Sequence, residues 1–290
     1  VYKLVPIETP LNPENPYQMG RIDANTMYEI VKKWQWGNSE SDKIYHDPET
    51  RKNSITFRSN LHRLAEEFIS LGDNYKALEI LNLSFEKLPI EYFGYYSLSE
   101  PYINSYYKIG EKEKSRNLFL KIEKKYHEQI NYYSNSMILN PDNFDLEIHA
   151  ENIFNYNERL RGLIENQIDI GEERFVSEFI LKYMKSTDIF KDLYGEYDFY
   201  NYMKSFITPL YVSEKDTDAR NLYEKIKSLI LSRLDTLISA NDNSNSEYIT
   251  DLITQELEKY ENLVNIISKF EEKKYLDVEI SDYDKYLNQF

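Results

Sequence analysis

The stretch RSNLHRLAEEFISLGDNYKALEIL, residues 58–81, decides how this chain folds. Its apolar and small residues recur at helical spacing on both sides of a glycine, and the pattern continues to a proline: Leu61, Leu64, Ala65, Phe68, Gly72, Ala77, Leu81, Phe85 and Pro89. The later positions recur 38 residues further on, as Tyr102, Ile103, Tyr106, Gly110, Ser115, Phe119 and Ile122. Self-similarity at a fixed period is typical of stacked supersecondary units.

Each unit reads as a pair of antiparallel helices. Gly72 and Gly110 stand where a short turn requires a left-handed residue, and Ala77 and Ser115 stand where a close helix crossing requires a small side chain. A third pair is expected at about 149–186, where Leu160, Leu163, Ile164, Gly171, Val176 and Ile180 occupy the same registers. The pattern is tetratricopeptide-like, so we predict an all-α fold of helix-pair repeats, an α-solenoid.

The segments outside the repeats divide the chain into three parts. Residues 1–54 are expected to form a proline-rich arm, a first helix capped near Asp23 or Asn25, and a polar loop over 38–54. Residues 55–187 hold the repeats. Residues 188–290 begin with an aromatic helix or helix pair that ends before Pro209 and continue as a long hairpin at 213–275, capped by Ser213 and joined by the linker NDNSNS at 241–246. No substantial sheet is expected.

Composition excludes several classes of function. With 50 Asp and Glu against 35 Lys and Arg, the net charge is −15, which disfavours duplex nucleic acid and anionic membrane surfaces as partners. The chain has no Cys, so disulfides, Cys-based zinc sites and cysteine nucleophiles are excluded. It has no apolar run long enough to insert into a membrane. Because it opens on Val1 without a Met, we interpret it as a piece of a longer protein.

Motifs for catalysis or metal binding are missing from the sequence. The four His residues are scattered, and His127-Glu128 lacks the second His of the metalloprotease helix. NDNSNS lacks the glycine and distal Glu of a calcium loop. The chain has neither a glycine-rich phosphate loop nor a nucleophile elbow. We therefore predict no catalytic residue, no metal site and no cofactor.

The first helices of a stacked array line its concave face, and their outward positions are the candidate binding residues. These positions are His62, Glu66, Glu100, Asn104, Tyr107, Lys108, Arg161 and Glu165. Their mixed charge disfavours a clamp for a peptide carboxylate but suits a polar chain or a partner's loop. The alternative interpretation is an ordinary solvated face.

Aromatic residues form two clusters in the sequence. Their two alternative roles are ligand or partner binding and packing in the core. The first cluster is Tyr92, Phe93, Tyr95 and Tyr96; the second is Tyr194, Tyr197, Phe199, Tyr200 and Tyr202. Tyrosine stacks on sugar rings or anchors interfaces, but it also packs in cores, and this chain has 27 of them. Packing is the expected use.

Four short strings in order carry a family resemblance: YKLVPIE at 2–8, MYEIVKKWQWGN at 27–38, YHDPETR at 45–51 and the opening stretch at 58–81. They resemble the soluble C-terminal region of a bacterial multi-spanning membrane protein family of unknown function, related to protein O-mannosyltransferase-like glycosyltransferases. The resemblance is good over residues 1–130 and thin beyond 187. It implies tetratricopeptide-like helices on the periplasmic side of the inner membrane, with any sugar transfer in the membrane-embedded half.

Three hypotheses of function follow. The first is a non-catalytic interaction domain of such a membrane protein, binding a protein or glycan partner near the membrane-embedded half of the same polypeptide. The second is a free-standing glycan-binding repeat protein, similar to starch-utilisation lipoproteins. The third is an all-helical enzyme such as an α-toroid glycosidase, which needs two carboxylates about 5 to 10 Å apart in a cleft.

Overall fold

The computed structural model describes residues 22–139, 146–186, 191, 195–244, 246–271 and 273–287. Within these ranges every regular element is helical and none is a β-strand, so the predicted all-α repeat fold is confirmed. Residues 1–21 of the predicted proline-rich arm, and Tyr194, lie outside the described residues. The chain divides into two compact units, Val1–His127 and Glu128–Phe290. The boundaries at 54/55 and 187/188 stay predictions.

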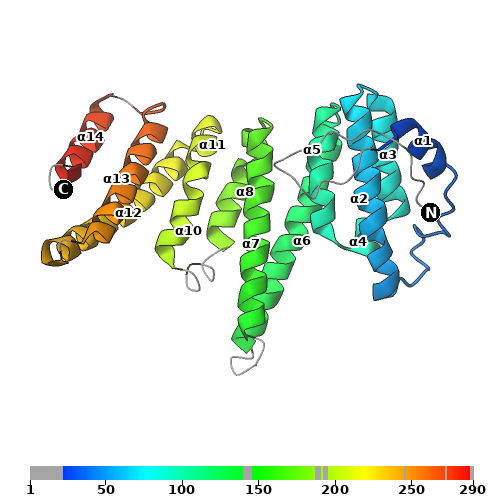
Figure 1. Ribbon diagram of the computed structural model, residues 1–290, viewed down its shortest axis with the longest axis horizontal. Helices are drawn as coiled ribbons and strands as arrows, with labels where there is room; N and C mark the ends of the chain where they lie inside the picture. The colour runs from blue at the N-terminus through cyan, green and yellow to red at the C-terminus, as the bar shows by residue number, and fades with distance from the viewer. Residues whose placement is uncertain are drawn as a thin grey trace. The chain divides into compact units, whose positions relative to one another are not determined.

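The first unit is built around the pair formed by α2 (Pro48–Ser70) and α3 (Asn74–Lys87), which lie side by side (Figure 1). Three short elements pack on α2: α1 (Ala24–Val31), α4 (Ile90–Phe93) and the 3₁₀ turn η1 (Tyr96–Ser99). The second pair is α5 (Glu100–Lys108), which packs on α2 and α3, and α6 (Lys112–Leu139), which ends in the second unit. The apolar residues of the opening stretch are buried in this core: Leu61, Leu64, Ala65, Phe68, Ala77 and Leu81.

The second unit also consists of packed helix pairs. The pair α7 (Leu146–Asp169) and α8 (Glu173–Ser186) is followed by α10 (Glu196–Tyr202), η2 (Met203–Phe206) and α11 (Ile207–Val212). The chain then forms α12 (Asp216–Ser244), α13 (Glu247–Ile267) and α14 (Lys273–Leu287). Helix α8 packs on α7 and α11, α12 packs along α11 and α13, and α14 packs on α13 (Figure 1).

One turn geometry recurs in four helix pairs. At each turn, one residue has a positive φ and donates its N–H three residues back, and the next residue donates five residues back, which is the Schellman arrangement. In the first turn these bonds are Gly72 N to Ile69 O at 3.0 Å and Asp73 N to Phe68 O at 2.9 Å. The equivalent turn residues are Gly110, Gly171 and Glu214. Five residues after each turn lies a fully buried side chain: Ala77, Ser115, Val176 and Ala219.

The fourth pair, formed by α11 and α12, differs from the prediction for residues 188–215. Pro209 lies inside α11 and not after the end of a helix. Proline is tolerated there because residues in the first turn of a helix donate no backbone N–H within the helix. Ser213 is the C-cap of α11 and not the N-cap of the long helix, which begins at Asp216. The sequence lacks the usual signal for this turn, because Glu214 adopts φ 60° where the other three turns have a glycine. The core residues of the pair nevertheless match the other repeats: Met203, Phe206, Ile207, Leu210 and Ala219.

Two further loop predictions are wrong. Helix α2 begins inside the predicted loop over 38–54, because the Asp47 carboxylate accepts the N–H groups of Glu49 and Thr50 at 2.9 and 3.0 Å and Pro48 occupies the first turn. The predicted linker at 241–246 is helical through Ser244. Polar residues lower helix propensity by only about 0.5 kcal/mol each, so α12 continues through them.

Candidate functional site

Three of the predicted binding residues meet in a polar cluster between α2 and α5. Ser105 Oγ donates to Glu66 Oε1 at 2.5 Å, and Lys108 Nζ donates to Glu66 Oε2 at 2.8 Å. His62 Nε2 lies 2.9 Å from Ser105 Oγ. Because the single hydroxyl proton of Ser105 goes to the carboxylate, His62 Nε2–H is the donor to Ser105. We call these four residues the His62 cluster.

Burial and hydrogen bonding shift the pKa values of this cluster. Burial lowers the pKa of His62 below its ordinary value, and the nearby Glu66 carboxylate only partly opposes this. Burial acts to raise the pKa of Glu66, but the hydrogen bonds from Lys108 and Ser105 outweigh it and leave that pKa lowered. The surroundings therefore favour the neutral form of His62 and the carboxylate form of Glu66.

The His62 cluster contains the side chains of a serine nucleophile but in an unsuitable arrangement. Ser105 is fully buried, so its hydroxyl does not reach a substrate. Its proton goes to Glu66, whereas nucleophilic catalysis requires the histidine to accept it. The geometry instead joins the first helices of two successive repeats.

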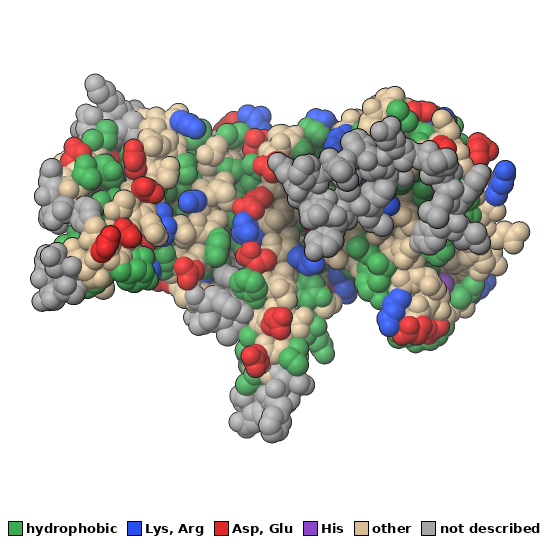
Figure 2. All heavy atoms as spheres, in the orientation of Figure 1, with side chains coloured by type: hydrophobic (Ala, Val, Ile, Leu, Met, Phe, Trp, Pro, Cys, Tyr) green, Lys and Arg blue, Asp and Glu red, His purple; other side chains and the backbone are tan. Residues whose placement is uncertain are grey.

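A second cluster joins Arg161 and Glu165, the predicted residues of the second unit. Arg161 donates to both carboxylate oxygens of Glu165 at 2.8 and 2.9 Å, and to Glu158 at 2.9 Å. Its guanidinium lies 5.5 Å from the centre of the Tyr202 ring, and Ser205 Oγ donates to Glu165 Oε1 at 3.0 Å. Hydrogen bonds from its guanidinium to Glu158 raise the pKa of Arg161. Figure 2 shows acidic and basic side chains interspersed over the surface of α7.

Glu66 and Glu165 occupy the same register, six residues before their turn glycines. Each accepts a serine hydroxyl from the following repeat and a hydrogen bond from a cation. The charges that the sequence assigns to a binding face are thus largely neutralised inside the chain. The resulting contacts hold neighbouring repeats in register.

The remaining predicted residues have other surroundings. Glu100 accepts a hydrogen bond from the hydroxyl of Tyr126. The ring of Tyr107 lies 4.8 Å from the Lys112 ammonium, within cation–π range. Asn104 is half-buried on α5. The structure therefore joins His62, Glu66 and Lys108, and separately Arg161 and Glu165.

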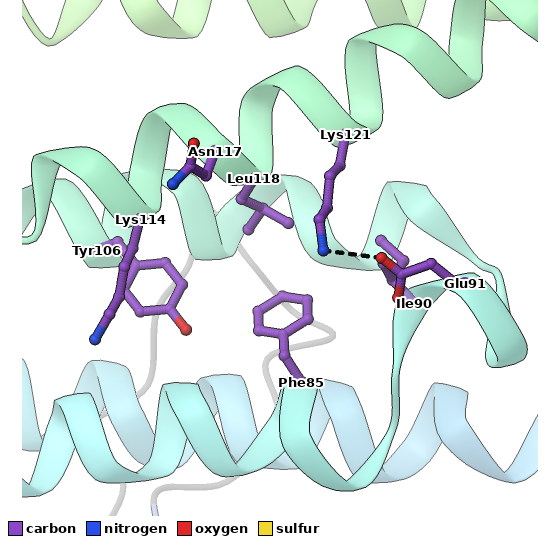
Figure 3. Close-up of a pocket in the computed structure, with 8 residues that line it drawn as sticks. All are labelled: Phe85, Ile90, Glu91, Tyr106, Lys114, Asn117, Leu118 and Lys121. Atoms are coloured by element: carbon purple, nitrogen blue, oxygen red, sulfur yellow. Dashed lines mark hydrogen bonds and ion pairs between the residues drawn. The ribbon is translucent and has the colours of Figure 1, made fainter. Parts of the chain in front are cut away.

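A groove in the first unit was not predicted from the sequence. Phe85 of α3, Ile90 of α4, Tyr106 of α5 and Leu118 of α6 form its apolar floor, and its rim consists of Glu91, Lys114, Asn117 and Lys121. Its cavity measures about 190 Å³. Figure 3 shows Phe85 and Leu118 pointing toward each other from facing helices, with the ion pair between Lys121 and Glu91 at 2.8 Å. We call it the α3–α6 groove.

The lysines of this rim belong to the N-terminal part of α6. Residues 112–125 contain six Lys and Arg against two Glu, a local charge of +4 in a chain of −15. Lys114, Leu118 and Lys121 share one helix face because they are spaced at i, i+4 and i+7. This concentration of charge is visible in the sequence and marks the helix that supplies the lysines, but it does not reveal the groove, which four elements form together.

Buried carboxylates in the second unit explain part of the tyrosine content. Glu279 is buried and accepts hydrogen bonds from Tyr223 at 2.6 Å and Tyr260 at 3.2 Å, and Lys227 lies 2.6 Å away. Glu256, also buried, accepts a hydrogen bond from Tyr197. Burial and this bond raise the pKa of Tyr197 to about 12. These tyrosines are used for packing and for satisfying buried charge.

Within the described ranges, His, Asp and Glu side chains do not converge in groups of three or more that could hold a metal ion. Among the same residues, no helix has both the length and the apolar character required to cross a bilayer.

Comparison with known proteins gives no family. No family model matches this sequence, and no curated protein matches it. Among solved structures, it is similar to a circular tandem repeat protein with novel repeat topology and enhanced subunit contact surfaces. The identity is 13%, the match covers 92% of this chain and 52% of that chain, and the TM-score is 0.24. The chain thus spans about half of that protein. A TM-score this low does not indicate a shared fold. The all-α repeat fold of this chain is shown by the helices and turns described above.

Proposed function

We propose that this chain is a non-catalytic helical-repeat domain that binds a protein partner. The observation that carries this proposal is the fourfold recurrence of one helix-pair turn with a buried residue five positions later. Such repeats present extended surfaces whose function is usually binding. The internal pairing of the predicted polar residues favours a stabilising role for them and leaves binding to other surfaces.

We further propose that the domain is the extracytoplasmic, periplasmic part of a membrane glycosyltransferase-like protein. The support is the ordered set of four sequence strings, which resembles that family. In this arrangement the domain holds an acceptor protein or glycan near the membrane-embedded half and raises its effective concentration.

An antibody raised against this chain, used to blot fractionated cells of the source organism, tests whether the chain is part of a larger membrane protein. We expect a band much heavier than 34.8 kDa, confined to the membrane fraction. A soluble band near that mass would contradict the proposal and favour the free-standing alternative. Turnover of a lipid-linked sugar donor by the purified chain would contradict a non-catalytic role.

A free-standing glycan-binding protein is the second candidate, because several tyrosines are strongly exposed. Tyr45, Tyr75 and Tyr248 are 80%, 79% and 71% exposed, and such rings stack on sugars. Titration with oligosaccharides tests this function. A saturable change in tyrosine fluorescence or heat supports it, and no change at millimolar sugar counts against it.

A further inference from the structure

The α3–α6 groove combines an apolar floor with a polar rim that contains two lysines, one asparagine and one glutamate. Ile90, Tyr106 and Leu118 are buried, and the half-buried Phe85 ring completes the floor from α3. The ammonium groups of Lys114 and Lys121 flank Leu118 along α6 (Figure 3). A ligand here meets apolar surface in the middle and positive charge on two sides.

The size of the cavity limits the kind of ligand. At about 190 Å³ it is smaller than the roughly 300 to 1,000 Å³ of sites that enclose a small molecule or cofactor. It is suited to one large side chain inserted from a partner, which is how anchor residues occupy protein interfaces. The groove therefore fits a protein segment with a single apolar anchor.

The lysines of the rim already have acidic neighbours. Lys121 pairs with Glu91 at 2.8 Å and Lys114 with Glu111 at 3.3 Å, and all four side chains are at least a third exposed. Exposed ion pairs contribute little to stability, so an incoming carboxylate replaces Glu91 or Glu111 at small cost. The local charge of +4 over residues 112–125 favours an acidic ligand.

We propose that the α3–α6 groove binds an acidic peptide segment of a partner protein through one aromatic or large aliphatic anchor residue. This inference deepens the binding role proposed above and rests on it. A nucleic acid fits less well, because two groove lysines are too few to neutralise a phosphate backbone and the apolar floor accepts a single side chain.

The spacing of the lysines defines the segment further. Lys114 and Lys121 are seven positions apart in α6, which is about 10 Å along the helix. An extended peptide covers this distance in about three residues. We therefore expect acidic residues on both sides of the anchor, three or four positions apart.

The test uses a fluorescein-labelled, capped peptide of sequence EEFEE, with KKFKK and EEAEE as control peptides, in fluorescence anisotropy. We expect saturable binding of EEFEE alone, weakened by added salt. The double variant Lys114→Gln, Lys121→Gln should weaken it at least about tenfold, because both flanking charges are lost. Lys124→Gln, on an exposed position of the same helix outside the groove, should change it less than about twofold.

Amide chemical-shift mapping provides the second readout. EEFEE should perturb residues of α3 and α6, and the double variant should keep the shifts of its core residues, which shows that it remains folded. No binding of EEFEE at millimolar concentration, equal binding of KKFKK, or equal weakening by Lys124→Gln would overturn the groove proposal. None of these results bears on the cell-fractionation experiment. A soluble band in that experiment would contradict the proposed membrane-protein origin and would leave the groove proposal unaffected.

Discussion

Gln167 is a buried polar residue in a position that the other repeats give to larger rings or aliphatic groups. It is fully buried, and among the described residues neither its side-chain oxygen nor its nitrogen finds a hydrogen-bond partner. The equivalent residues, four before each turn, are Phe68, Tyr106 and Leu210. An unsatisfied buried amide destabilises the fold by the free energy of its lost hydration.

We expect Gln167→Leu to raise the free energy of unfolding of the second unit by about 1 to 2 kcal/mol. Urea unfolding with an unchanged m-value measures this. Gln255→Leu, at an exposed position of α13, is the control and should have little effect. A loss of stability in Gln167→Leu would mean that the amide is satisfied in solution.

His62 makes the stability of the first unit dependent on pH. Burial lowers the pKa of His62 below its ordinary value of 6.5, so the folded state favours neutral histidine. The unfolded chain therefore takes up a proton first as the pH falls. The stabilisation is complete above about pH 6.5 and is lost as the pH falls through the folded pKa.

We predict that the melting temperature falls between about pH 7 and pH 5, and that His62→Gln removes most of this dependence. Thermal melts in matched buffers measure it. Glu66 and Lys108 face His62, but the pKa of Glu66 is lowered from 4.5, so its effect belongs to more acidic solutions. An identical pH slope in the variant would show that another group is responsible.

At the scale of single elements, the fourth turn should be the least stable of the four. Glu214 adopts φ 60°, which disfavours a side chain with a Cβ atom, whereas the other three turns use glycine. Its ion pair with Arg174 is 3.7 Å long and highly exposed, and therefore contributes little.

We expect Glu214→Gly to stabilise the second unit by about 0.5 to 1 kcal/mol and Gly171→Ala to destabilise it by about 1 kcal/mol. Chemical unfolding of both variants tests the pair. Destabilisation by Glu214→Gly would mean that the greater freedom of glycine in the unfolded chain outweighs the relieved strain.

For the whole molecule, each of the two compact units buries apolar residues of its own. Leu64 and Leu163 occupy equivalent registers in the first and second unit, and both are buried. In repeat proteins each repeat interacts mainly with the repeats next to it. A loss of packing in one repeat therefore affects mainly that repeat and its neighbours.

We therefore predict that Leu64→Ala destabilises the first unit by about 3 kcal/mol through the cavity it leaves. Amide exchange should accelerate in α2, α3 and α5 more than in α12 and α13, and Leu163→Ala should accelerate exchange most in α7 and α8. Equal acceleration throughout the chain by either variant would show that it unfolds as one cooperative unit.

Local signals in the sequence were sufficient for the fold class. The apolar spacing around Gly72 and Gly110 and the small residues Ala77 and Ser115 all act within one helix pair, so they are readable without tertiary information. The signal for the start of α2 is also local, since Asp47 and Pro48 form an ordinary helix N-terminus. The polar residues around it give the segment the composition of a loop.

The sequence by itself determined an all-helical chain of repeated pairs, because helix periodicity and a glycine turn are short-range properties. Only the tertiary structure decided which side chains meet. The contact between Glu66 and Ser105 joins residues 39 apart, and the α3–α6 groove requires four elements to pack together. Tertiary packing also imposed a left-handed turn on Glu214, because the buried Leu210 and Ala219 on either side outweigh the local preference of one residue.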